Sequence, residues 1–146
     1  MAYWLMKSEP DVFSYTDLEN KPVEEWHSVR NYTARNNMKA MKVGDLAFFY
    51  HSNIGKEIVG IMKVVAPAHP DSTAEPNDKG KIVWECVDVA HHMRLPKPVT
   101  LETIKQTPEL ANMALVKLSR LSVGPVTPDE WKLICKMGGL KQAPSA

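Results

Sequence analysis

The chain has 146 residues, and its 18 Lys and Arg residues nearly balance its 17 Asp and Glu residues, which gives a formal net charge of +1. This balance argues against a protein that grips duplex nucleic acid through many phosphate contacts, although it allows a local basic patch or a pocket that reads one nucleotide. No run approaches the roughly 18 apolar residues of a membrane span, and Lys7, Glu9 and Asp11 interrupt any secretory signal, so we expect neither membrane insertion nor secretion.

The first 45 residues predict one strand and two helices. The aromatic and branched residues of segment 3–7 indicate a strand. Ser14 is a suitable N-cap for a short helix, with Asp17 three residues later. A second helix is expected to begin at Asn31, because the apolar residues after it recur at i, i+4 and i+7 and can form one buried stripe: Ala34, Met38 and Met41.

The central segments 45–52 and 57–65 are expected to form a hairpin through the short polar link between them. Both segments are apolar on successive residues, which suits a sheet covered on both faces, as in a barrel with helices packed against it. Prolines and turn residues predict a loop over segment 67–81.

The C-terminal half predicts a long strand over 82–93, followed by an extended path over 94–99 that its prolines limit. Thr100 and Thr107 are expected to be N-caps of short helical pieces. The last helix is the most clearly defined, since residues 127–130 form a capping box with proline at the first helical position, followed by a buried stripe and a stop signal: Trp131, Ile134, Cys135 and Gly138. With no repeat and no boundary, the chain is expected to be one α+β domain.

The two cysteines, Cys86 and Cys135, lie on a predicted strand and a predicted helix and lack the spacing of metal ligands. We therefore expect two reduced, buried thiols, no metal site and no cofactor, in the cytoplasm of a bacterium or the nucleus of a eukaryote. The sequence also lacks the spacings of the common catalytic motifs, which favours a binding module over an enzyme.

The segment from Trp26 to Asn37 is the strongest candidate for a binding site. Asn31 and Arg35 share a helix face, Arg30 precedes the first turn, and Trp26 lies in the preceding loop, where we expect its ring to be free. A nucleobase needs this combination of a ring to stack on and donors for its edge. The alternatives stay open, since a tryptophan is more often a core residue and a helix face rich in Arg and Asn is more often solvated. The other tryptophans are assigned to the core: Trp4, Trp84 and Trp131.

Other polar residues lie where predicted strands end, at positions that often form the rims of binding sites. Lys7 and Ser8 lie at the end of the first predicted strand, and Ser52 and Asn53 lie where the predicted strand 45–52 enters the hairpin link. Arg120 lies between leucines and is either a surface charge or a phosphate contact.

Several motifs in order resemble the EVE-domain family: YWLMKSEPDVFSYTDL, VRNYTARN, MKVGDLAFFYHSN, LPKPVTL and LSVGPVTPDEW. The resemblance covers about residues 2–139. It implies a PUA-like fold, a β-pseudobarrel with short helices around it, similar to the PUA, ASCH and YTH domains. It assigns residues 1–140 to the domain and 141–146 to a short tail.

The same resemblance implies that the domain reads a modified base. The stretch at Lys7 and Ser8 is similar to a YTH motif, and Trp26 falls where YTH domains supply a tryptophan of their aromatic cage. The second cage tryptophan has no counterpart before Trp84, which leaves room for a smaller pyrimidine. The residues carried over as pocket candidates are Lys7, Ser8, Trp26, Arg30, Asn31, Tyr32, Arg35, Ser52, Asn53 and Arg120.

The leading hypothesis is thus a monomeric, non-enzymatic module that binds DNA or RNA carrying a modified base, with modified cytosine as one candidate. One alternative is a nucleic-acid-directed hydrolase of ASCH-like type, for which Lys7, Glu9 and His51 would be the nearest acid–base set. Another is a pocket for a free nucleotide or metabolite. His51 has no nucleophile or carboxylate partner in the sequence, so we expect it to be a hydrogen-bonded histidine without a catalytic role.

Overall fold

Six strands form one mixed sheet in the computed structural model, which describes residues 2–146. Along the sheet the order is β2–β5–β4–β3–β1–β6. The strands are β1 (Tyr3–Ser8), β2 (Glu24–Glu25), β3 (Leu46–His51), β4 (Glu57–Pro70), β5 (Glu85–Thr100) and β6 (Val123–Val126). The helices are α1 (Tyr15–Glu19), α2 (Tyr32–Ala40), α3 (Leu101–Lys105), the 3₁₀ helix η1 (Pro108–Leu110), α4 (Ala114–Lys117) and α5 (Pro128–Met137).

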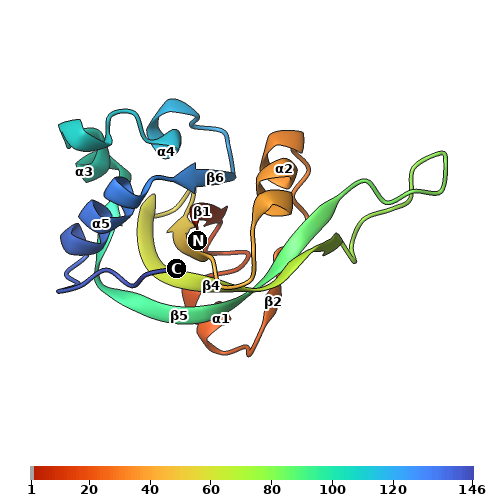
Figure 1. Ribbon diagram of the computed structural model, residues 1–146, viewed down its shortest axis with the longest axis horizontal. Coiled ribbons are helices and arrows are strands. Elements are labelled where there is room, and N and C mark those ends of the chain that lie inside the picture. The colour runs from red at the N-terminus through yellow and green to blue at the C-terminus, as the bar shows by residue number, and fades with distance from the viewer. Residues whose placement is uncertain (1) are drawn as a thin grey trace.

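The two long strands β4 and β5 curve around the rest of the molecule (Figure 1). Their pairing shifts register at several points, and such bulges bend a strand and increase its twist. β1 pairs in parallel with β3, and the other pairs are antiparallel. Within residues 2–146 the sheet ends at β2 and β6, so the barrel is not closed by a continuous ladder of hydrogen bonds. The predicted α+β class is confirmed.

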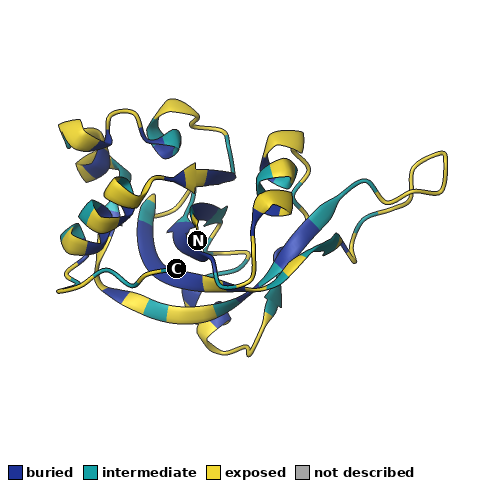
Figure 2. Cartoon of the chain, in the orientation of Figure 1, coloured by how far each residue is buried: buried dark blue, intermediate teal, exposed yellow. Residues whose placement is uncertain are grey.

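Both faces of the sheet are covered, as the successive apolar residues of the central strands predicted. Neighbours along a strand point to opposite faces, so Phe49 lies in the core beneath α1 and α2, whereas Phe48 lies in a second core with Trp131 of α5. Figure 2 shows the buried central strands and the exposed outer faces of the helices. Trp4 is buried too, and its indole N–H donates to the Asp45 carboxylate at 3.0 Å.

The helix starts are well predicted, because capping depends on residues close in the sequence. Ser14 and Thr127 each form a capping box, and the Asn31 side chain accepts a hydrogen bond from the Ala34 amide at 2.9 Å. The Thr100 side chain caps α3 as expected. Thr107 holds the N-cap position of η1, but its side chain makes no capping hydrogen bond.

Two sequence predictions in the middle of the chain are wrong. The predicted loop 67–81 begins later, because β4 continues to Pro70. Pro67 lies where the pairing of β4 with β5 shifts register, so the backbone N–H that proline lacks is not required for a regular ladder of hydrogen bonds. Trp84 was assigned to a strand and to the core, yet β5 begins at Glu85 and the Trp84 side chain is only partly buried. The loop between β4 and β5 extends away from the sheet (Figure 1).

Cys86 and Cys135 are free and buried, as expected. The last residues lie against the domain: the Trp131 indole donates to the Pro144 carbonyl at 2.9 Å, and the Ala146 amide donates to the Tyr3 hydroxyl at 3.3 Å. Among the helices of residues 2–146, none is long and apolar enough to cross a membrane.

Candidate functional site

A cavity of about 370 Å³ opens beside Trp26, between the end of β1 and the segment that follows β2. We call it the Trp26 cavity. Part of its wall is apolar and comes from Val12, Phe13, Trp26 and Val29. The rest is polar and charged, and it includes Lys7, Ser8, Glu9, Glu24, Glu25 and Arg30. The cavity therefore offers apolar surface, donors and acceptors together.

The Trp26 ring is less accessible than the sequence suggested. Only 6% of the residue is exposed, and the ring packs edge-on against Phe13 and Phe49, with centroids 6.4 and 5.5 Å away. The expectation of a ring free in a loop is therefore wrong. Its amide donates to the Val87 carbonyl at 2.9 Å, so the chain still follows β5 at this point and turns the side chain inward, away from its polar neighbours. Trp26 is thus a fixed, well-packed part of the cavity wall.

The backbone after Trp26 turns sharply at Ser28, whose φ of 70° lies in the left-handed region that favours glycine. The Ser28 amide donates to the Asp71 carboxylate at 2.7 Å, and Arg30 forms an ion pair with the same oxygen at 3.1 Å. Asp71 is 1% exposed. Burial alone would raise the pKa of Asp71, but hydrogen bonds from Thr73, Ser28 and Arg30 outweigh it and lower the pKa to about 2.

The opposite side of the cavity is built by the end of β1. The Ser8 hydroxyl donates to the Phe13 carbonyl at 2.6 Å, which holds the chain close as it enters α1. Lys7 is half-buried; its ammonium group donates to the Ser119 carbonyl at 2.9 Å, and its amide donates to the Ser122 carbonyl at 2.9 Å. Burial lowers the pKa of Lys7.

Two further hollows adjoin the first along segment 118–122. One of about 240 Å³ includes Lys7, Ser52 and Asn53, and so shares Lys7 with the Trp26 cavity. The other, of about 300 Å³, includes Asn31 and Arg120 and borders the same connecting segment. The structure thus places most of the predicted site residues around three neighbouring hollows. Whether these residues bind a ligand stays a prediction.

Tyr32 and Arg35 are the predicted residues that line none of these hollows. The Tyr32 ring, in a residue 59% exposed, stacks on Trp84 with centroids 4.8 Å apart and an interplanar angle of 27°. The Arg35 guanidinium lies 4.9 Å from the Tyr32 ring, and that of Arg30 lies 5.6 Å from the Trp84 ring. We call these four residues the aromatic stack. Arg35 also donates to the Val83 carbonyl at 3.0 Å, so it ties α2 to the long loop and does not face Asn31's hollow.

Sequence reasoning missed Trp84 and Asp71 as parts of this region. Trp84 was read as a core residue, although its position directly after a long polar loop was a signal against that reading. Asp71 gave no local signal, because its partners Ser28 and Arg30 lie about forty positions earlier in the chain.

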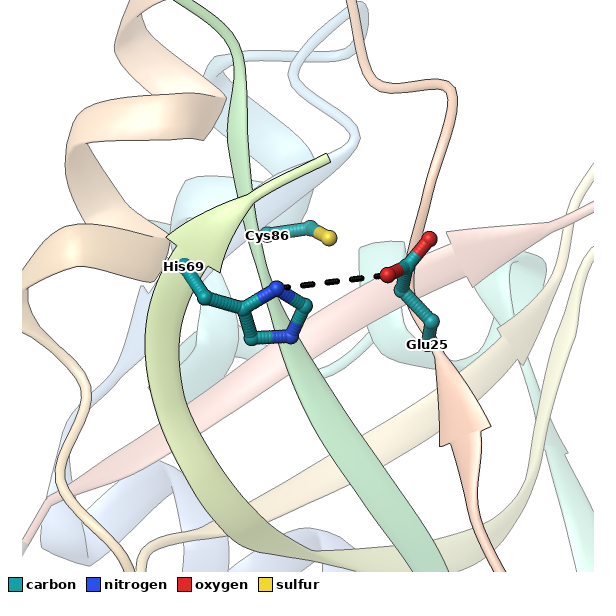
Figure 3. A group of neighbouring side chains, drawn as sticks. All are labelled: Glu25, His69 and Cys86. Atoms are coloured by element: carbon teal, nitrogen blue, oxygen red, sulfur yellow. Dashed lines mark ion pairs between the residues drawn. The ribbon is translucent and has the colours of Figure 1, made fainter. Parts of the chain in front are cut away.

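Glu25, His69 and Cys86 form one group of potential metal ligands, with one ligand atom from each lying within 4.8 Å of the others (Figure 3). Carboxylate, imidazole and thiolate are ligands that Zn²⁺ takes. The protein already satisfies this group, since His69 Nε2 lies 2.7 Å from Asp88 Oδ1, and this hydrogen bond is the main cause of the raised pKa of His69. Burial, with nearby carboxylates, raises the pKa of Cys86 to about 12, so a metal ion would have to displace a firmly held proton.

His51 is hydrogen-bonded, as expected. Its Nε2 accepts a hydrogen bond from the Tyr15 amide at 3.1 Å, and its ring packs edge-on against Phe49. Burial and the charge of Arg94 lower the pKa of His51. Glu9 and Lys7 line the Trp26 cavity, but His51 does not, so the acid–base set considered above is not gathered around one hollow.

Comparisons with known proteins identify the family of the chain. The model of the EVE domain matches residues 2–137. Thymocyte nuclear protein 1 of Mus musculus is 38% identical over 164 residues, covering 92% of this chain and 73% of the mouse protein.

Two solved structures are similar over nearly the whole chain. A crystal structure of a protein from Agrobacterium tumefaciens is 48% identical, with a TM-score of 0.90, and the match covers 99% of this chain and 100% of that one. The crystal structure of the human THYN1 protein in complex with DNA containing 5-methylcytosine is 33% identical, with a TM-score of 0.87, and covers 97% and 99% of the two chains.

Proposed function

Because the chain belongs to the EVE-domain family, we propose that it is a non-enzymatic module that binds nucleic acid and takes one modified base into the Trp26 cavity. The family and the PUA-like fold are those that the sequence motifs predicted. The complex of the human relative with DNA containing 5-methylcytosine supports nucleic acid as the partner and makes 5-methylcytosine the first base to test.

The size of the cavity supports a single base as its occupant. Its volume of about 370 Å³ is at the small end of the ~300–1,000 Å³ found for ligand pockets. A base in a duplex is stacked, so entry into this cavity requires the base to be extruded or single-stranded. The near-zero net charge also fits capture of one base better than a long grip on the backbone.

The lining supports a methylated cytosine in particular. The Glu24 carboxylate can accept a hydrogen bond from the exocyclic amine of cytosine, and Arg30 can donate to its acceptor edge. A 5-methyl group needs apolar contact, which Val12 and Val29 supply. Val12 is 75% exposed, so it stands at the mouth of the cavity. The observation that carries the proposal is this cavity with the Trp26 indole as one wall.

The test is to measure binding of matched oligonucleotides, with cytosine or 5-methylcytosine at one position, to the wild type, Trp26→Leu and Trp131→Leu. Leucine keeps apolar packing but removes the aromatic face. Base–aromatic stacking contributes roughly 1–3 kcal/mol, so Trp26→Leu should weaken binding of the methylated strand about 5- to 150-fold and reduce the preference for it.

Trp131→Leu is the matched control, because it removes a buried tryptophan of the second core that does not line the cavity. It should keep the preference for the methylated strand. Circular dichroism and thermal melts identify any variant that does not fold. An unchanged preference in folded Trp26→Leu would contradict the proposal.

A further inference from the structure

Three lysines line the hollow that adjoins the Trp26 cavity. They are Lys7 of β1, Lys56 of the β3–β4 turn and Lys105 of α3, and we call the hollow the lysine cleft. No acidic residue lines it. Across residues 2–146, none of the ion pairs includes any of these three lysines. A larger hollow of about 510 Å³ continues from it, shares Lys56 and Lys105, and is also lined by Glu102. The cleft therefore concentrates positive charge in a chain whose net charge is only +1.

The turn that carries Lys56 has an unusual backbone. Asn53, Gly55 and Lys56 all have positive φ, at 68°, 89° and 50°. Glycine adopts this region freely and asparagine tolerates it, but lysine is disfavoured there. The Lys56 carbonyl accepts a hydrogen bond from the Leu101 amide at 2.9 Å, which fixes the turn against the start of α3. A disfavoured conformation held in place at the edge of a cavity is a reason to look for function.

The same backbone feature marks both hollows. Within residues 2–146 the non-glycine residues of positive φ are Ser28, Asn53 and Lys56. Ser28 lines the Trp26 cavity, and Asn53 and Lys56 line the lysine cleft. Lys7 borders both hollows. One ligand could therefore reach from one hollow into the other past Lys7.

We propose that the lysine cleft binds the backbone phosphates that flank the base held beside Trp26. The inference rests on the proposed function and adds a second, sequence-independent part to the same site. Ammonium groups without carboxylate partners attract anions, and the hydroxyl and amide groups of Ser52, Asn53 and Ser119 can donate to phosphate oxygens. Lys7 is already partly desolvated, so a phosphate beside it interacts more strongly than one at an open surface.

The test compares the salt dependence of binding of a single-stranded oligonucleotide carrying one 5-methylcytosine. In Lys56→Gln/Lys105→Gln two phosphate contacts are lost, which should reduce the slope of log K against log salt by about 1.4 for a single strand. If the rest of the binding free energy is unchanged, affinity should fall about tenfold at ~200 mM salt. The preference for the methylated over the unmethylated strand should stay the same, because phosphates carry no information about the base.

Lys132→Gln/Lys136→Gln is the matched control. These lysines line a separate hollow on α5 that shares no residue with the lysine cleft. Their removal takes away the same charge and should leave the slope nearly unchanged. An equal reduction by both pairs would mean general attraction by charge and would overturn the proposal, as would an unchanged slope in Lys56→Gln/Lys105→Gln.

Two further outcomes separate this inference from the base-reading proposal. A wild type that shows no preference for the methylated strand, together with the reduced slope in Lys56→Gln/Lys105→Gln, would overturn base reading and support the cleft. Inorganic phosphate is the second probe. If phosphate alone perturbs the NMR signals of Lys56 and Lys105 at concentrations where the oligonucleotide binds, the cleft is a site for a free anion, and the backbone proposal fails.

Discussion

Arg30 and Asp71 form an ion pair in which Nη1 lies 3.1 Å from Oδ2, and the same oxygen accepts a hydrogen bond from the Ser28 amide at 2.7 Å. This contact joins the segment after β2 to the start of the long loop, at the edge of the Trp26 cavity. The buried Asp71 carboxylate therefore fixes both the backbone turn at Ser28 and the guanidinium group of Arg30.

Asp71→Asn should destabilise the protein in a pH-dependent way. The pKa of Asp71 is lowered from 3.8 to about 2, so its ionised form contributes about 2 kcal/mol of stability above the unfolded-state pKa. That contribution is lost as the pH falls through the folded pKa. Urea unfolding should show a difference in the free energy of unfolding between wild type and variant. This difference should be largest near neutral pH and shrink towards pH 2.

Asp78→Asn, at an exposed position of the same loop, is the control and should change the free energy of unfolding little at any pH. A gap between wild type and Asp71→Asn that stays constant over the whole range would show that the charge of Asp71 is not what stabilises the turn.

The aromatic stack should couple α2 to the long loop. Stacked aromatic pairs contribute ~0.5–1.5 kcal/mol beyond their buried area, so a double-mutant cycle of Tyr32→Ala and Trp84→Ala should give a coupling energy of that size. Hydrogen exchange in the loop should become faster in either single variant. If the losses of stability in the two single variants simply add in the double variant, the stack does not hold the loop.

Lys56→Gly should stabilise the protein and weaken its binding of nucleic acid. A left-handed conformation costs a non-glycine residue ~1–2 kcal/mol, whereas the entropy that glycine loses on folding costs ~0.5–1 kcal/mol, which leaves a gain of about 0.5–1 kcal/mol. Thermal melts measure this gain. Lys56→Ala keeps the Cβ atom and should not show it, and equal melting temperatures for the two variants would count against strain at this turn.

His69 should titrate above its ordinary range. The hydrogen bond to Asp88 is the main cause of the raised pKa, with further contributions from the Pro70 carbonyl and Glu25, while burial opposes them. Its protonation therefore adds stability that is fully present below the unfolded-state pKa of about 6.5 and is lost as the pH rises through the folded pKa. NMR titration of the ring should give a midpoint above that value, and Asp88→Asn should lower it.

His92 serves as an internal reference in the same titration. Burial and the charges of Lys63 and His91 lower its pKa, so its midpoint should move in the opposite direction. A His69 midpoint at or below that of His92 would contradict the arrangement of His69 between two carboxylates.

The sequence was a good guide wherever the cause is local. The capping boxes at Ser14 and Thr127 and the buried faces of the central strands depend on residues within a few positions, so their patterns could be read directly. The motifs also predicted the family. Trp26 was misjudged because its polar neighbours suggested a loop, whereas the alternation of a strand turns its side chain into the core.

The parts of the site that the sequence did not reveal depend on distant partners. Asp71 meets Ser28 and Arg30 through the loop between β4 and β5. Lys56 and Lys105 come together only because α3 packs against the β3–β4 turn, and nothing near either lysine in the sequence indicates the other. The positive φ of Lys56 also could not be predicted, because the sequence of this link is that of an ordinary hairpin turn.

Reading of the base requires that the modified base lie against Trp26. The most direct measurement uses an oligonucleotide whose single 5-methylcytosine carries a ¹³C-labelled methyl group, bound to the protein in solution. We expect intermolecular NOEs from that methyl group to Trp26 and Val29, with an upfield shift from the indole ring. NOEs to surface residues outside the cavity, or a methyl shift unchanged from the free strand, would contradict it.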